Sequence, residues 1–117
     1  MYKVIIAGCR DFADYALLCS FADQVLAGAA DIEIVSGGAR GADALGERYA
    51  RDRHYALKVF PADWNKWGRA AGPIRNGQMA DYADALIAFW DGQSSGTRDM
   101  IRKAEEKGLA VHVKMIR

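Results

Sequence analysis

The chain has 117 residues, of which 51% are hydrophobic and 26% are charged, and its net charge is +1. These values are typical of one globular domain spanning residues 1–117, and they exclude a general electrostatic attraction to nucleic acids or membranes. Because no apolar run approaches the roughly 20 residues of a membrane span and no signal-peptide pattern is present, we expect a cytoplasmic protein. The sequence leaves its oligomeric state open, and a homo-oligomer is one possibility.

Hydrophobic residues alternate between two patterns along the chain. Short apolar runs predict five strands, and apolar residues three to four positions apart predict helices between them. Strands that are apolar on both faces indicate a mainly parallel sheet, and right-handed crossovers then place helices on both sides of it in an α/β three-layer sandwich. The expected strands are residues 3–7, 32–35, 57–60, 85–90 and 109–115, and the expected helices are 13–26, 41–53, 73–82 and 96–107, the last capped by Gly108.

The segment 35–43, Val-Ser-Gly-Gly-Ala-Arg-Gly-Ala-Asp, joins the second expected strand to the helix that follows. The pair Gly37-Gly38 permits a tight turn, and the start of the helix offers free amides and the positive end of its dipole. Arg40 adds a guanidinium suited to phosphate oxygens. The segment matches neither the P-loop nor the dinucleotide fingerprint, so a plain strand-to-helix connection is the alternative interpretation.

Similar loops follow the first and fourth strands, and each of the three contains glycine and one arginine. The carboxyl ends of parallel strands meet at one edge of the sheet, where ligands bind in doubly wound folds. We therefore predict a site for a phosphorylated or nucleotide-like ligand at this edge. The ligand-binding residues expected there are Gly8, Cys9, Arg10, Ser36, Gly37, Gly38, Arg40, Gly41, Asp43, Arg69, Arg75, Asn76, Ser94, Ser95, Gly96, Thr97 and Arg98.

The segment 61–76 is rich in tryptophan and arginine. A helix that begins at Pro73 would point Arg75 and Asn76 from its first turn toward the strand ends. Trp64 and Trp67 have two interpretations. They cover the sheet, which we favour slightly, or one of them stacks on a nucleobase beside an arginine.

Neither metal binding nor cysteine chemistry is indicated. Cys9, Cys19 and the two histidines lack the spacing of metal ligands, and we expect no metal. A nucleophilic role for Cys9 at a helix start, where its pKa would fall, remains an alternative that lacks a nearby histidine base.

Taken together, these motifs resemble the YspA-like branch of the SLOG superfamily, to which the DprA/Smf proteins and the Lonely Guy enzymes also belong. The resemblance implies a Rossmann-like domain, with the strand order 3-2-1-4-5, that binds nucleotides or nucleotide-derived small molecules. It is carried by residues 8–12, 35–43, 60–64, 68–76, 83–88 and 95–97.

The Lonely Guy enzymes cleave the N-glycosidic bond of nucleoside monophosphates, using an arginine and the glutamate of a Gly-Gly-x-Gly-Thr-x-x-Glu motif. Arg75 matches the arginine, but Met100 occupies the glutamate position, and a thioether cannot act as a base. Asp91 or Asp99 would have to replace the missing carboxylate. Whether the chain is an enzyme therefore stays open, with Arg75, Asp91 and Asp99 as the candidate catalytic residues.

The favoured function is binding of a nucleoside phosphate or of a molecule related to ADP-ribose or NAD, in a sensor or a carrier. The alternatives are N-glycosidic hydrolysis, as in Lonely Guy enzymes, and single-stranded DNA binding, as the DprA resemblance suggests. The near-neutral net charge argues against nucleic acid as a partner. No cofactor other than the nucleotide-like ligand and no membrane partner is expected.

Overall fold

Five parallel strands form one sheet in the computed structural model, which describes residues 1–116. Strand β1 is central, and the order β3-β2-β1-β4-β5 confirms the predicted order. In the register of the sheet, Val4 of β1 pairs with Ile34 on one side and with Ala85 on the other. The strands are β1 (Tyr2–Gly8), β2 (Ile32–Ser36), β3 (Ala56–Val59), β4 (Ala85–Trp90) and β5 (Ala110–Met115).

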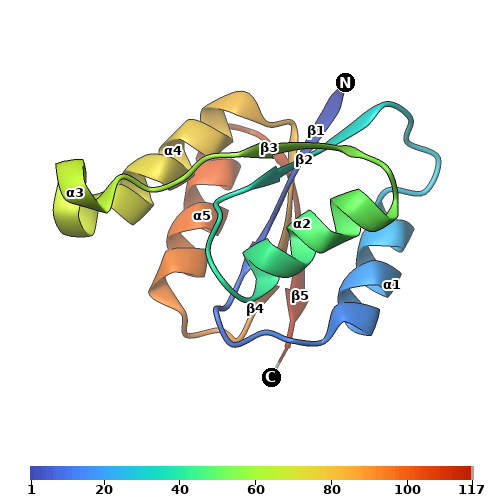
Figure 1. Ribbon diagram of the computed structural model, residues 1–117, viewed down its shortest axis with the longest axis horizontal. Coiled ribbons are helices and arrows are strands. Elements are labelled where there is room, and N and C mark those ends of the chain that lie inside the picture. The colour runs from blue at the N-terminus through green and yellow to red at the C-terminus, as the bar shows by residue number, and fades with distance from the viewer. Residues whose placement is uncertain (117) are drawn as a thin grey trace.

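Helices cover both faces of the sheet, as the ribbon view shows (Figure 1). Val4 and Ile6 pack with α1 (Tyr15–Val25) and α2 (Ala42–Asp52) on one face, whereas Ile5 packs with α4 (Ala71–Tyr82) and α5 (Ser95–Glu106) on the other. Side chains of a strand alternate between faces, so this central strand supplies both halves of the core. The result is the predicted Rossmann-like three-layer sandwich. The chain also forms the short helix α3 (Trp64–Trp67) and the 3-10 turn η1 (Gly68–Ala70).

Helix α4 begins earlier than the sequence predicted. Its first residue is Ala71, so Pro73 is the third residue and not the first. The first four amides of a helix have no acceptor within that helix, and a proline in the first turn therefore removes no helical hydrogen bond. Because the helix begins at Ala71, Arg75 and Asn76 lie just past the first turn of α4 and not in it, but both still line the cavity at the strand ends.

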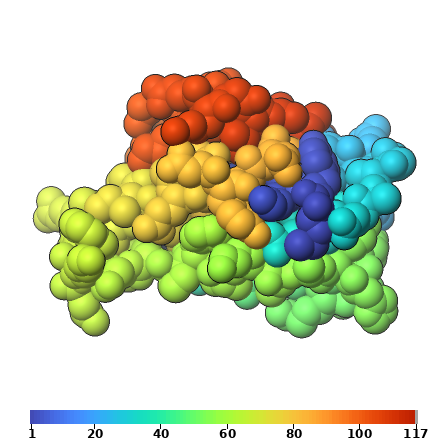
Figure 2. All heavy atoms as spheres, turned by 90° about the horizontal axis from the view of Figure 1, so that it is seen from above, coloured from blue at the N-terminus to red at the C-terminus, as the bar shows by residue number. Residues whose placement is uncertain are grey.

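The expectation that Trp64 and Trp67 cover the sheet is wrong. Both lie on α3, a short helix that the sequence pattern does not predict, and their side chains are 51% and 45% exposed. The segment that carries them projects from one end of the molecule, in yellow-green in the space-filling view (Figure 2). None of the helices within residues 1–116 has the length and apolar character needed to cross a membrane.

Candidate functional site

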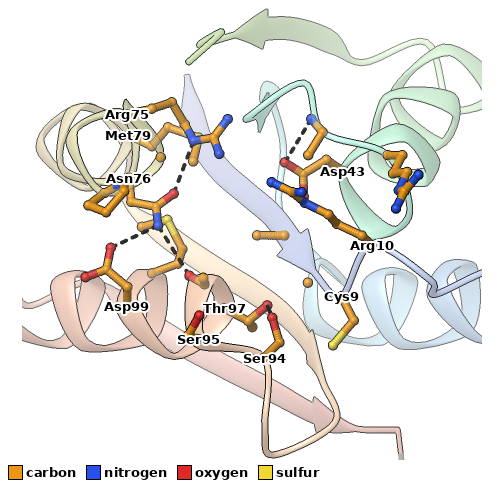
Figure 3. A pocket seen from close by; sticks show the side chains of 18 of the residues that line it. Cys9, Arg10, Asp43, Arg75, Asn76, Met79, Ser94, Ser95, Thr97 and Asp99 are labelled. Atoms are coloured by element: carbon orange, nitrogen blue, oxygen red, sulfur yellow. Dashed lines mark hydrogen bonds between the residues drawn. The ribbon is translucent and has the colours of Figure 1, made fainter. Parts of the chain in front are cut away.

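A cavity of about 680 Å³ opens at the carboxyl ends of the strands. It lies where β1 has β2 on one side and β4 on the other, which is the point in a doubly wound sheet where ligands bind. The close-up shows Arg10 and Asp43 on one side, Arg75 and Asn76 opposite, and the serine-rich start of α5 below (Figure 3). A second cavity of about 500 Å³ adjoins it, and both are lined by Arg10, Ala39, Arg40, Trp64 and Arg75.

The turn between β2 and α2 is held together by its own side chains. Buried Ser36 donates a hydrogen bond from Oγ to Glu47 Oε2 (2.8 Å) and accepts one from the Gly38 amide (3.1 Å). The Ala39 amide donates to Asp43 Oδ2 (3.4 Å). Two amides that the glycine turn was expected to offer to phosphate are therefore already used inside the protein.

The start of α2 is likewise engaged by the chain itself. The Ala42 amide donates to the carbonyl of Cys9 (3.2 Å). Gly41, with φ of 78°, lies so close to Cys9 and Arg10 that a Cβ atom would overlap their backbone. Gly41 is therefore required for close packing of two loops, and it does not line either cavity.

Arginine side chains supply the positive charge of the site. Arg10 and Arg40 line both cavities, and Arg69 lines the larger one. Within residues 1–116 these three side chains are exposed and have no hydrogen-bond or ion-pair partner. Arg75 differs, because it is half-buried and donates to the Gly37 carbonyl and to Asn76 Oδ1 (3.2 Å). We call Arg10, Arg40, Arg69 and Arg75 the arginine cluster.

The start of α5 forms the opposite wall of the larger cavity. Ser94, Ser95, Gly96 and Thr97 line it, and the side chain of the N-cap residue Ser94 makes no hydrogen bond to the amides of this helix. Asp91 Oδ1 accepts from the amide of Ser94 itself (2.8 Å), which leaves the amides of the first helical turn without a side-chain cap within residues 1–116. Ser94 Oγ and Thr97 Oγ1 lie 3.3 Å apart. Uncapped amides at the start of a helix carry partial positive charge and favour an anion. This wall and the arginine cluster therefore both favour an anion, from opposite sides of the cavity.

Buried Asn76 connects α4 to α5. Its Nδ2 donates to the Gly96 carbonyl (3.3 Å) and to Asp99 Oδ2 (3.0 Å), while its Oδ1 accepts from Arg75. All of its polar atoms are thus engaged, and its position follows from these contacts. Asn76 thereby links Arg75 to the start of α5.

The carboxylates of the site differ in their environment. Burial raises the pKa of Asp43 to about 6, against the opposing effect of Arg75. Burial also raises the pKa of Asp99, but hydrogen bonds from Asn76 and Lys103 outweigh it and the net pKa is lowered. Amides of Ser94 and Gln93 lower the pKa of Asp91.

The remaining lining residues include Met100, at the position of the Lonely Guy glutamate, and Cys9. Cys9 is buried, and burial raises the pKa of its thiol. It lies ahead of α1 and not at the start of that helix, so the alternative in which its pKa falls is wrong. No cluster of metal-binding side chains occurs within residues 1–116.

Most of the residues predicted from sequence lie at the two cavities, but Ser36, Gly41 and Arg98 do not line them. Arg98 instead donates to the Gly92 carbonyl (3.3 Å) and lies over the Trp90 ring. Sequence reasoning missed one face of α4. Its members recur at helical spacing, which is the signal that could have identified them: Gly72, Pro73 and Met79 beside Arg75 and Asn76.

The fold and the cavity at its switch point define a Rossmann-like α/β domain. The chain belongs to the YspA, cpYpsA-related SLOG family (YAcAr), whose model matches residues 2–67, and this confirms the resemblance found in the motifs. It is similar to the Gene 61 protein of Mycobacterium phage D29, with 36% identity over 118 residues, covering 95% of this chain and 94% of that protein.

Two X-ray structures share the fold. DNA processing protein A (DprA) from Streptococcus pneumoniae matches with a TM-score of 0.76 and 17% identity over 97% of this chain, which spans 50% of the DprA chain. TM1055 matches with a TM-score of 0.69 and 20% identity, covering 95% of this chain and 72% of that one.

Proposed function

We propose that the protein binds a nucleotide or a nucleotide-derived molecule in the two adjoining cavities, as a sensor or a carrier. The observation that carries this proposal is the arginine cluster. Three of its four members have no partner within residues 1–116, and all four line a cavity at the edge of the sheet where ligands of this fold class bind. Guanidinium groups bind phosphate through charge-assisted hydrogen bonds, so this concentration of them favours a phosphorylated ligand.

The arrangement of the cluster suggests how such a ligand lies. Arg10, Arg40 and Arg75 line both cavities, so a phosphate or diphosphate at their common boundary would contact all three. The start of α5 offers a second place for a phosphate or for ribose hydroxyl groups. A nucleoside phosphate and a molecule such as ADP-ribose both satisfy this pattern.

Binding without hydrolysis fits the site better than cleavage of an N-glycosidic bond. Met100 provides no carboxylate, and Asp99 already accepts hydrogen bonds from Asn76, Arg102 and Lys103. Asp91 is engaged by two backbone amides. Lowered pKa values make both aspartates weak bases at neutral pH.

Mass spectrometry of small molecules released from the purified protein tests the proposal directly. We expect a phosphorylated nucleoside derivative in amounts comparable to the protein. Calorimetry with AMP, ADP, ADP-ribose and NAD then measures affinity for the emptied protein. If no nucleotide is released and none of the four binds, the proposal is wrong.

Single-stranded DNA binding is a second candidate, favoured by one observation. Trp64 and Trp67 are both exposed on α3, next to the arginine cluster, and base stacking on aromatic rings beside basic residues is typical of single-strand binding. The similarity to DprA shows the fold and no more. Fluorescence anisotropy with labelled oligothymidylate at two salt concentrations separates this candidate from the first, because DNA affinity falls steeply with salt.

A further inference from the structure

The backbone around α3 keeps the side chains of its two tryptophans exposed to solvent. Asp63 accepts a hydrogen bond from the Lys66 amide (3.1 Å) and thereby caps the start of this short helix. Gly68, with φ of 56°, ends it. No residue of α3 is buried. Since burying an aromatic side chain is a large stabilising contribution in most folds, two exposed tryptophans call for a reason other than stability.

Trp64 and Trp67 have different surroundings despite being three residues apart. Trp64 lines both cavities, and its ring lies over the start of α4, where a Cβ atom on Gly72 would be 3.5 Å from Trp64 Cη2. Trp67 lines neither cavity, and Lys66 Nζ lies 4.8 Å from the centre of its ring. Only Trp64 therefore presents an open aromatic surface to the site.

The arginine cluster lies on the same cavity walls as this ring. Arg10 and Arg40 line both cavities together with Trp64, and each is free of partners within residues 1–116. An aromatic ring attracts the flat face of a nucleobase, and guanidinium groups attract phosphate. A nucleotide has both features, separated by its ribose.

We propose that Trp64 is the stacking platform for the base of a nucleotide whose phosphates lie on the arginine cluster, and that Trp67 has no part in binding. The inference rests on the proposed function and assigns the base-binding end of the same site. It places the base at the projecting end of the molecule, next to α3, and directs the phosphates inward toward the strand ends. A ligand with a planar ring then gains affinity from Trp64, whereas ribose 5-phosphate, which lacks such a ring, does not.

Calorimetry on the full chain tests this with Trp64→Ala, Trp64→Phe and the matched control Trp67→Ala. Stacking on an aromatic ring predicts that Trp64→Ala binds AMP about 5- to 150-fold more weakly. Trp64→Phe should recover most of that loss, and Trp67→Ala should match the wild type. Ribose 5-phosphate should bind the wild type and Trp64→Ala equally. Both tryptophans are exposed, so circular dichroism should report an unchanged fold for every variant.

Intrinsic fluorescence gives an independent readout. AMP should quench tryptophan emission in the wild type and in Trp67→Ala, but not in Trp64→Ala. If Trp64→Ala binds AMP as tightly as the wild type, or loses ribose 5-phosphate equally, stacking is wrong while nucleotide binding stands. If the wild type binds no nucleotide, the proposed function is wrong and this inference falls with it. Equal losses of oligothymidylate binding in Trp64→Ala and Trp67→Ala, without loss of AMP binding, would also overturn it and favour an extended single strand.

Discussion

The guanidinium of Arg75 donates a hydrogen bond to the carbonyl of Gly37, which links the start of α4 to the turn after β2. A Cβ atom on Gly37 would lie 2.6 Å from Arg75 Nη1 and 2.7 Å from Asp43 Oδ2. Because residue 37 has no side chain, Arg75 and Asp43 can both lie close to its backbone. The hydrogen bond to Gly37 therefore positions the guanidinium of Arg75, the half-buried member of the arginine cluster.

We predict that Gly37→Ala displaces Arg75 and weakens nucleotide binding. The loss of a charge-assisted hydrogen bond to phosphate corresponds to about 1.5–3 kcal/mol. Gly77→Ala is the matched control, because it lies in α4 with open space around its Cβ position and should be neutral or slightly stabilising. Calorimetry with ADP-ribose and thermal unfolding of both variants make the comparison. Equal affinity of Gly37→Ala and the wild type would show that the position of Arg75 does not matter for binding.

Arg40 should contribute to binding as an exposed, unpartnered member of the cluster. Arg40→Ala is expected to lower nucleotide affinity by about 1.5–3 kcal/mol with no change in the melting temperature. Arg98→Ala provides the control, because that guanidinium lies on the Gly92 carbonyl and outside both cavities. Calorimetry on the two variants should therefore give different results. The same loss in both would point to general electrostatics and not to a specific contact.

Gly38 has a positive φ of 74°, and a Cβ atom there would lie 3.3 Å from Val59 Cγ1. Gly38→Val should cost about 1–3 kcal/mol of stability through backbone strain and should also shift the turn that carries Arg40. Gly28→Val is the control for strain alone, since Gly28 has a φ of 79° and no atom near its Cβ position. Both variants should unfold at lower temperature, but only Gly38→Val should lose ligand affinity.

The pKa of Asp43 predicts a pH dependence of binding. Burial raises this pKa to about 6, so the carboxylate competes with phosphate for Arg75 at pH 7.5 and is largely protonated at pH 5.5. One unit of further pKa shift on binding corresponds to tenfold in affinity, so ADP-ribose should bind up to about tenfold more tightly at pH 5.5. Its diphosphate keeps the same charge in this range. Asp43→Asn should remove the dependence, and calorimetry at both pH values measures it.

The same shift makes the stability contribution of Asp43, like the ligand affinity, fall as pH rises. Because the folded-state pKa of Asp43 lies above its ordinary value of 3.8, the folded protein binds more protons than the unfolded one between these pH values. The contribution of Asp43 to stability is therefore full below pH 3.8 and is lost as pH rises to about 6. Urea unfolding of the wild type and Asp43→Asn across this window should show the difference. A wild-type stability that rises with pH relative to Asp43→Asn would contradict the raised pKa.

The parallel sheet and the convergence of three loops were predictable because they depend on apolar periodicity and the handedness of crossovers. The strand order followed from the resemblance to the SLOG superfamily. The hydrogen bonds that the Gly38 and Ala39 amides donate within the turn were not predictable. Their partners are Ser36 and Asp43, whose side-chain directions depend on how α2 packs against β2. The burial of Trp64 was predicted wrongly for a related reason. Hydrophobicity predicts burial, but a four-residue helix beyond the edge of the sheet lies outside the hydrophobic core.

Met100 in place of the Lonely Guy glutamate predicts binding without cleavage of the ligand. Met100 lines the cavity where Lonely Guy enzymes have glutamate, and Asp91 and Asp99 hold lowered pKa values and several hydrogen bonds. General-base assistance accounts for about 10²–10⁴ in rate, so the wild type should bind AMP or ADP-ribose and release no free base above background. Chromatography of overnight incubations measures this. Base release that disappears in Asp91→Asn or in Asp99→Asn would instead identify a hydrolase with a relocated carboxylate.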